Sequence, residues 1–491
     1  MTVKRPIAAL ITSAVATLVL AVGLHAQESH LQVGARLAQE GQMAEAKAEL
    51  LKAYEEGPDS QPCLAWLGFV CLQLQQPDEA VRHLAKAAEI DPADPIVHNN
   101  LGNAYFDTDD MASAEKHYQA AIEQEQDYFE AHYNLANLYA RQRRWSESFN
   151  EYNRAIAINS NDADVHRDFG KALENSGNTD KAIREYKAAA EIEPDDELVH
   201  TALGTLHLRK QSFQTAAEHY GEALKRPEGP HTFEAQLGLG IALFMQKQYG
   251  AALQHLRAAA AAKPEEFLPH YYLGLALAYA EQYPEAGTAY EAALRIKPDE
   301  PECLSNLGWV RFQQGDTQKA IELFSKASAE STGFYLAALN LAIAYDKAAE
   351  TDKAFEQWKL LAAKFSTRAT PHIGLANAYY DRDMSDEALA EYLRGLELDS
   401  TNVDAHNNVA LIYMSRGDLD EAVSHLKMAL HTDSKYKYAC NNLGVAYEKL
   451  GKKSEAIEQY RRALAIDPDY EHAKQNLRRL TEPVATETAT G

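Results

Sequence analysis

The chain of 491 residues carries 72 acidic and 48 basic side chains, which gives a formal net charge of −24. Duplex nucleic acid and anionic membranes attract proteins through clustered cationic side chains, so this balance argues against either as a general partner. We expect the acidity to keep a long exposed surface soluble.

Residues 1–26 differ in composition from the rest of the chain. Lys4 and Arg5 precede an uncharged run that ends at Leu24, and His25 and Ala26 follow. This layout is typical of a secretory signal and predicts an exported, periplasmic or secreted protein, with cleavage after Ala26 or Gly23. The alternative is that residues 7–24 stay as a tether in the inner membrane, with the rest in the periplasm, because a run of about 18 apolar residues can span a bilayer. No cysteine directly follows the run, which excludes a lipoprotein anchor.

From Gln27 to Tyr470 the chain consists of thirteen copies of a 34-residue unit, one of which carries two extra residues. The eighth position of the unit is Gly or Ala in every copy, as in Gly274 and Gly444. The twentieth position is Ala in every copy except one, which has Ser148. A period of this length is typical of stacked repeats that share one continuous core, and it overrides a domain count based on length.

Each unit predicts two helices joined by a short turn, as residues 437–470 illustrate. Apolar residues recur at helical spacing up to Leu450, Gly451 follows, and a second helical run ends before Pro468. Residues 471–480 predict one more helix that caps the array. The small polar tail 481–491 is predicted to be disordered.

Repeat 5 (163–196) shows the side-chain pattern most fully, as Phe169-Gly170, Gly177, Ala182, Tyr186, Ala189 and Pro194. The pattern resembles the tetratricopeptide repeat family over residues 27–470. The resemblance implies an all-α fold, a right-handed α-α superhelix (solenoid) of about 13 repeats. It also implies that positions 2, 5, 6, 9, 12 and 13 of each unit face the concave groove.

No catalytic motif is present: the sequence lacks a phosphate-binding loop, Gly-x-Ser-x-Gly, His-Glu-x-x-His and a Walker pattern. We therefore predict that the chain is not an enzyme and needs no cofactor. Cys63 and Cys71 lie eight residues apart on one predicted helix, which is about 12 Å along its axis and too far for a disulfide. Cys303 and Cys440 lie four repeats apart, and we predict all four cysteines to be small buried apolar residues.

Histidine recurs at the fourth position of many units, among them His98, His132, His166, His200, His270, His372 and His406. Packed helices lie about 10 Å apart, whereas zinc ligands lie about 2 Å from one metal, so equivalent histidines of neighbouring repeats cannot share an ion. We predict no metal site, and a partly buried place for these rings at the interface between repeats.

Asparagines occupy several groove positions near the two ends of the array: Asn100, Asn134, Asn407, Asn408, Asn441 and Asn442 are the candidates for peptide binding. Side-chain amides both donate and accept hydrogen bonds, so a row of them can hold an extended backbone. The resemblance alone also accounts for them, since asparagine is common at these positions in the family.

Repeats 7 to 10 instead place apolar side chains at the groove positions. The set comprises Leu237, Ile241, Phe244, Met245, Leu268, Tyr271, Leu275, Tyr279, Trp309, Phe312, Leu336, Leu339 and Ile343. Contiguous exposed apolar side chains usually mark an interaction surface, so this groove predicts a site for a partner helix or an apolar peptide. The alternative is that these side chains pack inside the chain.

Four basic residues of repeats 4 to 6 are candidates for binding a carboxylate: Arg141, Arg167, Lys171 and Arg209. Nearby acidic residues such as Asp164 and Asp168 could simply neutralise them.

These patterns together predict a protein–protein interaction scaffold of the bacterial cell envelope. The alternatives are an accessory subunit of a secretion, pilus or polysaccharide machine, and a recognition partner of a separate enzyme such as a glycosyltransferase. The sequence does not fix the oligomeric state or the partner.

Overall fold

The computed structural model describes residues 28–226, 229–330 and 335–482. The predicted signal or anchor (1–26) lies outside this range, as does the tail from residue 483. No helix among the described residues has the length and apolarity that a bilayer span requires. Residues 227 and 228, in the repeat that carries two extra residues, are not described either.

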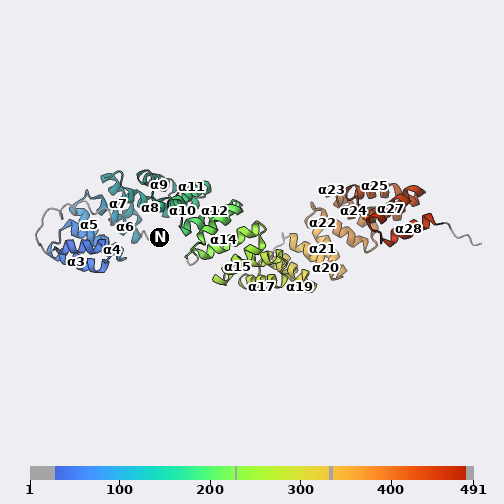
Figure 1. Ribbon diagram of the computed structural model, residues 1–491, viewed down its shortest axis with the longest axis horizontal. Helices are drawn as coiled ribbons and strands as arrows, with labels where there is room; N and C mark the ends of the chain where they lie inside the picture. The colour runs from blue at the N-terminus through green and yellow to red at the C-terminus, as the bar shows by residue number, and fades with distance from the viewer. Residues whose placement is uncertain (1–27, 227–228, 331–334, 483–491) are drawn as a thin grey trace, which may run out of the picture. The chain divides into compact units, whose positions relative to one another are not determined.

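The described residues form 27 α-helices and no strand, which confirms the predicted all-α repeat fold (Figure 1). The chain divides into two compact units, residues 1–242 and 243–491. The first unit contains α2 (His30–Gln39), α3 (Met43–Glu56), α4 (Gln61–Gln73), α5 (Pro77–Ile90), α6 (Pro95–Asp107), α7 (Met111–Gln124), α8 (Phe129–Arg141), α9 (Trp145–Ile158), α10 (Ala163–Asn175), α11 (Thr179–Ile192), α12 (Glu197–Arg209), α13 (Phe213–Ala223) and most of α14 (Thr232–Met245).

The second unit begins near the end of α14. It contains α15 (Tyr249–Ala262), α16 (Phe267–Tyr279), α17 (Tyr283–Ile296), α18 (Pro301–Gln313), α19 (Thr317–Glu330), α20 (Tyr335–Lys347), α21 (Thr351–Lys364), α22 (Ala369–Tyr380), α23 (Ser385–Leu398), α24 (Val403–Arg416), α25 (Leu419–Thr432), α26 (Lys437–Lys449), α27 (Lys453–Ile466) and α28 (Glu471–Thr481). Within each unit every helix packs most closely on its neighbours in the sequence, as expected for a linear stack.

The turn inside each repeat depends on one residue with a left-handed backbone. That residue is glycine in some repeats, as at Gly451 with φ of 76°, a polar residue in most others, as at Asp109 with φ of 65°, and Ala349 in repeat 10. Glycine adopts this conformation without a Cβ penalty, and Asp or Asn tolerates it better than most residues. The helix that follows in repeat 3 is capped by Asp110, which accepts a hydrogen bond from the Ser113 amide.

Close packing inside a repeat depends on the small residue at the eighth position. A Cβ atom added at Gly444 would lie 2.5 Å from the ring of Tyr460, and one at Gly274 would lie 2.7 Å from Tyr290. The two helices therefore approach until the aromatic ring of the second covers the bare backbone of the first. Any larger side chain at these positions would force the pair apart.

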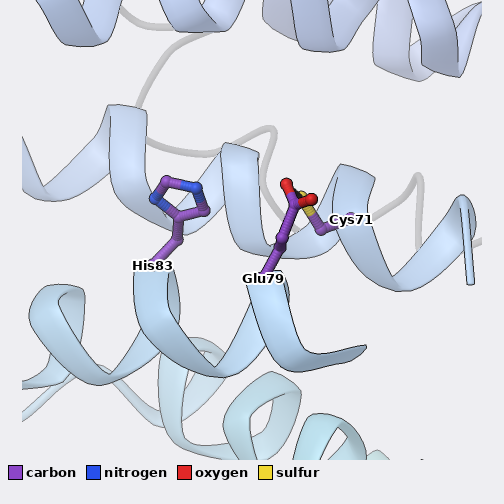
Figure 2. Close-up of side chains that lie close together, drawn as sticks. All are labelled: Cys71, Glu79 and His83. Carbon is purple, nitrogen blue, oxygen red and sulfur yellow. Dashed lines mark hydrogen bonds between the residues drawn. The ribbon is translucent and has the colours of Figure 1, made fainter. Parts of the chain in front are cut away.

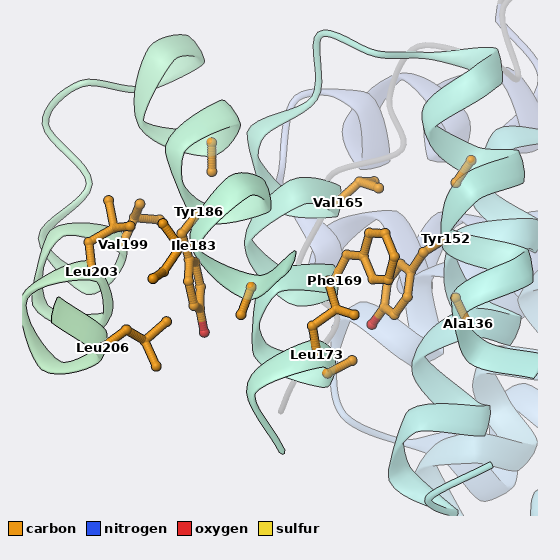
Figure 3. Close-up of a cluster of buried hydrophobic side chains, with 14 of the residues drawn as sticks. Ala136, Tyr152, Val165, Phe169, Leu173, Ile183, Tyr186, Val199, Leu203 and Leu206 are labelled. Atoms are coloured by element: carbon orange, nitrogen blue, oxygen red, sulfur yellow. The ribbon is translucent and has the colours of Figure 1, made fainter. Parts of the chain in front are cut away.

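The core continues from one repeat to the next through aromatic contacts. In the cluster of Figure 3, Tyr152 of repeat 4 stacks on Phe169 of repeat 5 with ring centroids 5.0 Å apart. Both rings are buried, and Tyr186 extends the cluster toward Val199 of repeat 6. No repeat buries its apolar faces alone, so its stability depends on its neighbours.

Candidate functional site

The end of α14 and the helices α16, α18 and α20 of the second unit carry large apolar side chains in contact with solvent. Tyr279 is 61% exposed and Trp309 is 37% exposed. Met245, Leu268, Leu336 and Ile343 are exposed as well. These six belong to the apolar set that the sequence places at groove positions, and exposed aromatic and aliphatic side chains so close in a stack are characteristic of contact surfaces.

A pocket of about 360 Å³ opens among α16, α17, α18 and α20. Its lining comprises Leu275, Ala278, Tyr279, Tyr290, Ser305, Asn306, Trp309, Leu336 and Asn340. A volume of this size matches the smaller ligand-binding clefts of proteins and holds one or two large side chains. We call this cavity the apolar pocket.

Tyr290 lines the apolar pocket, and its hydroxyl has no hydrogen-bond partner among the described residues. The equivalent tyrosines of other repeats are satisfied internally: Tyr118 donates to Asn103 at 2.8 Å, and Tyr152 donates to Asn137 at 2.7 Å. In repeat 8 the position of that asparagine is Leu275, which offers no acceptor. Burial raises the pKa of Tyr290, so its hydroxyl stays protonated and can donate to a ligand.

Two amides complete the polar part of the pocket. Asn340 has no hydrogen-bond partner among the described residues, and Asn306 donates to the Tyr271 hydroxyl at a long 3.4 Å. The pocket therefore combines apolar walls with a few convergent polar groups, which is the usual chemistry of a recognition site. Asn306 and Asn340 both occupy position 6 of their repeats, which is a groove position. The sequence therefore contained a signal for these two residues, although the apolar residues are the more conspicuous pattern in these repeats.

Aromatic contacts hold the rim of the pocket in place. Tyr279 stacks on Tyr249 with centroids 5.3 Å apart and meets Phe244 edge-on at 5.6 Å. Trp309 meets Tyr283 edge-on at 5.6 Å. These rings keep an exposed face while their other faces pack, so the rim is preorganised for a partner.

The remaining apolar candidates are less accessible. Phe312 and Leu339 are half-buried and pack against separate core clusters of the second unit, so internal packing accounts for much of their surface. Leu237 and Ile241 are half-buried in the first unit. The site therefore centres on the exposed residues around the pocket.

Five of the six asparagine candidates form hydrogen bonds within the chain. Asn100, Asn134, Asn407 and Asn441 are buried. Asn134 donates to Asn99 at 2.9 Å, and at the other end of the array Asn442 donates to Asn407 at 2.9 Å and Asn476 donates to Asn441 at 3.0 Å. Asn408 donates to the Tyr392 hydroxyl at 3.0 Å. These amides link one repeat to the next, which leaves few of them free for a peptide.

The basic candidates are mostly neutralised by acidic side chains. Arg141 pairs with Asp109 at 2.8 Å, and Arg209 pairs with Glu174 at 3.1 Å. Arg167 contacts Asp164 and pairs with Asp196 at 3.1 Å. Lys171 is exposed. Since all three guanidinium groups already have carboxylate partners, a carboxylate ligand would have to compete with them.

The histidines at the fourth position lie at the interface between repeats, as their pattern suggests. His166 places Nε2 3.2 Å from the Ser160 carbonyl oxygen, and its Nδ1 lies 2.8 Å from Glu185 of the same repeat. In three repeats a second histidine replaces that glutamate: His98 faces His117, His200 faces His219 and His406 faces His425, with Nδ1 atoms 2.9–3.2 Å apart. The four cysteines are free and buried, as predicted.

Known proteins place the chain in one family. Tetratricopeptide repeat models match residues 37–329 and 376–470. No curated protein matches the sequence.

Among solved structures, a protective antigen of uropathogenic Escherichia coli with an SLR fold aligns with a TM-score of 0.55 and 17% identity, over 82% of this chain and 90% of its own. This likeness shows the fold alone. The APC/C complex Cut9–Hcn1 gives 0.39 and 13% over 96% and 99%, and MamA of Desulfovibrio magneticus RS-1 gives 0.33 and 28% over 35% and 96%. On the family models, which cover most of its length, the chain belongs to the tetratricopeptide repeat family.

Proposed function

We propose that this chain is a non-catalytic scaffold that holds an apolar segment of a partner protein in the apolar pocket of repeats 8 to 10. Tetratricopeptide repeats generally mediate protein–protein interactions, which supports the class of function. The observation that carries the site is that Tyr290 and Asn340 line an apolar cavity, while the Tyr290 hydroxyl and the Asn340 amide have no hydrogen-bond partner among the described residues.

The partner segment enters the pocket with one or two large apolar side chains. Tyr279, Trp309 and Leu336 provide the contact area, and burying such side chains supplies most of the binding free energy. Tyr290 and Asn340 then donate or accept hydrogen bonds with the segment's polar groups, which adds specificity because an unmatched ligand would leave them unsatisfied.

The proposal extends to the cell envelope through residues 1–26, whose charged start and apolar run support export or anchoring. Mass determination of the N-terminus of the protein purified from cells separates the two, because cleavage removes the apolar run and anchoring retains it.

A random peptide display library selected on the full chain tests the binding site. Selected peptides should be rich in aromatic and aliphatic residues and should lose at least about ten-fold in affinity, by fluorescence anisotropy, for Tyr279→Ala and for Trp309→Ala. Phe312 is left unchanged because it packs in the core.

Tyr438→Ala is the matched control, since this tyrosine is 45% exposed on α26, away from the pocket residues. Circular dichroism should show equal helicity for all variants. Equal affinity of the selected peptides for the pocket variants and the control would contradict the proposed site.

A further inference from the structure

One cluster of metal-ligating side chains lies in the first unit, in repeat 2. Sγ of Cys71, a carboxylate oxygen of Glu79 and a ring nitrogen of His83 lie within 4.8 Å of one another. Cys71 is on α4, while Glu79 and His83 project from one face of α5 toward it (Figure 2). Spacing of four residues puts Glu79 and His83 on adjacent turns of the same helix face.

The three residues occupy positions 11, 19 and 23 of one repeat. They can therefore lie closer together than equivalent histidines of successive repeats, which the spacing of the repeats keeps apart. In repeat 3 the same positions are Tyr105, Ser113 and His117, and the Tyr105 ring stacks on His117. In repeat 2 the small Cys71 replaces the aromatic ring. Of the thirteen repeats, only repeat 2 has metal-ligating residue types at all three positions.

The histidine of this cluster has no hydrogen-bond partner among the described residues. In repeat 3, Nδ1 of His117 lies within hydrogen-bond distance of Nδ1 of His98, which occupies the fourth position. The fourth position of repeat 2 is Leu64, which cannot form a hydrogen bond with a ring nitrogen. His83 makes instead an edge-on contact with Tyr54 at 5.8 Å. Its ring nitrogens are thus available as ligands.

We propose that Cys71, Glu79 and His83 form a binding site for Zn²⁺. A thiolate, an imidazole and a carboxylate are the ligands that zinc prefers, and three protein ligands leave a fourth position for water or another group. Cys71 is fully buried, whereas Glu79 and His83 are half-buried and can rotate to close on the ion.

Lys47 of the preceding repeat competes with Zn²⁺ for the Glu79 carboxylate. Its ammonium lies 2.7 Å from Glu79 Oε2, and it also contacts Gln76. Arg82 and Lys86 add positive charge near His83. Zn²⁺ replaces the ammonium on Glu79 and displaces the proton of the Cys71 thiol, whose pKa is raised by burial. Affinity should therefore increase with pH and should increase when Lys47 is removed.

Titration of the tag-free full chain with Co²⁺, followed by displacement with Zn²⁺, tests the site. We expect the near-ultraviolet thiolate-to-cobalt absorption band at one equivalent. Cys71→Ser should abolish the band, and Glu79→Gln and His83→Ala should weaken Zn²⁺ binding by about ten-fold or more. Lys47→Met should strengthen Zn²⁺ binding, which a purely structural ion pair would not predict.

Two controls keep the interpretation specific. Cys63→Ser removes the other buried thiol of α4, which contacts the Leu50 carbonyl oxygen, and should leave the band unchanged. His117→Ala removes the histidine at the same position of the next repeat and should also have no effect. Absence of the band in the wild-type chain, its loss in Cys63→Ser, or weaker binding by Lys47→Met would each overturn the proposal.

Discussion

Two stretches of the second unit carry asparagines at groove positions but differ in how those asparagines are bonded. In α22, α24 and α26 the groove positions carry asparagines that bond to one another or to a tyrosine, as Asn442 does to Asn407. In α18 and α20 the sixth position is asparagine as well, but Asn306 donates to the Tyr271 hydroxyl at a long 3.4 Å, and Asn340 has no hydrogen-bond partner among the described residues. The asparagines that bond to a neighbouring repeat thus stabilise the array, and the surface left for a partner appears where such bonds are long or missing among the described residues.

The largest effect should come from Trp309→Ala. Loss of this ring removes a wall of the apolar pocket and should cost about 2 kcal/mol of peptide binding free energy, since aromatic side chains at the centre of an interface dominate affinity. The ring is partly exposed, so the melting temperature should fall by only a few degrees. Fluorescence anisotropy with a selected peptide and thermal unfolding measure the two effects.

The stretch formed by α22, α24 and α26 should respond in the reverse way: a substitution there should reduce stability and leave peptide affinity unchanged. Asn407→Ala removes the acceptor for Asn442 in a buried place, and should cost about 1–2 kcal/mol of unfolding free energy while peptide affinity stays the same. Asn340→Ala is the matched variant, because Asn340 has no partner among the described residues. It should leave stability nearly unchanged and weaken peptide binding. Urea unfolding distinguishes them, and equal destabilisation by both would remove the distinction between the stretches.

A third variant places in repeat 8 the hydrogen-bonded asparagine that repeat 3 has at the same position. Leu275→Asn supplies the acceptor that Tyr290 lacks among the described residues, in the arrangement that Tyr118 has with Asn103. The new hydrogen bond should offset most of the apolar packing that the leucine side chain provides, so stability should change by less than about 1 kcal/mol. Peptide affinity should fall, because the hydroxyl is engaged and the wall has become polar.

Leu275→Ala is the control for the smaller apolar area alone, and it should destabilise the chain more than Leu275→Asn does. If Leu275→Asn were the less stable of the two, Tyr290 would not be short of an acceptor.

The sequence predicts the repeat fold well because the period fixes it. Gly444 and Tyr460 recur at constant spacing, and their packing follows from the missing Cβ. The apolar groove candidates follow from side-chain type at known positions. What the pattern could not give is which polar groups find partners: Asn407 and Asn340 are the same residue at neighbouring positions of the unit, yet only Asn407 of these two meets an amide of the next repeat among the described residues. That depends on side chains about 35 residues away, which no local pattern contains.

The smallest expected effect is a loss of local stability at acidic pH. His425 faces His406 in repeat 12, and burial followed by the neighbouring His406 lowers the pKa of His425. A histidine whose pKa is lowered by folding binds fewer protons in the folded than in the unfolded chain, so the stability it contributes is present above its ordinary pKa of about 6.5 and is lost as pH falls below it. Hydrogen exchange of α24 and α25 should therefore show less protection at pH 5.5 than at pH 7.5, by a fraction of a kcal/mol to about 1 kcal/mol.

His425→Glu reproduces the pair of repeat 11, in which His372 lies 2.6 Å from Glu391. A carboxylate favours the protonated ring, so the variant should keep its protection at pH 5.5. Repeats 8 to 10 contain no such histidine pair, since His270 faces Ala289 and the other two repeats have Leu304 and Ala338 at the fourth position. Peptide binding at the pocket should accordingly persist at a pH that reduces the protection of repeat 12. If peptide binding and this protection were lost at the same pH, the two stretches would unfold as one cooperative body.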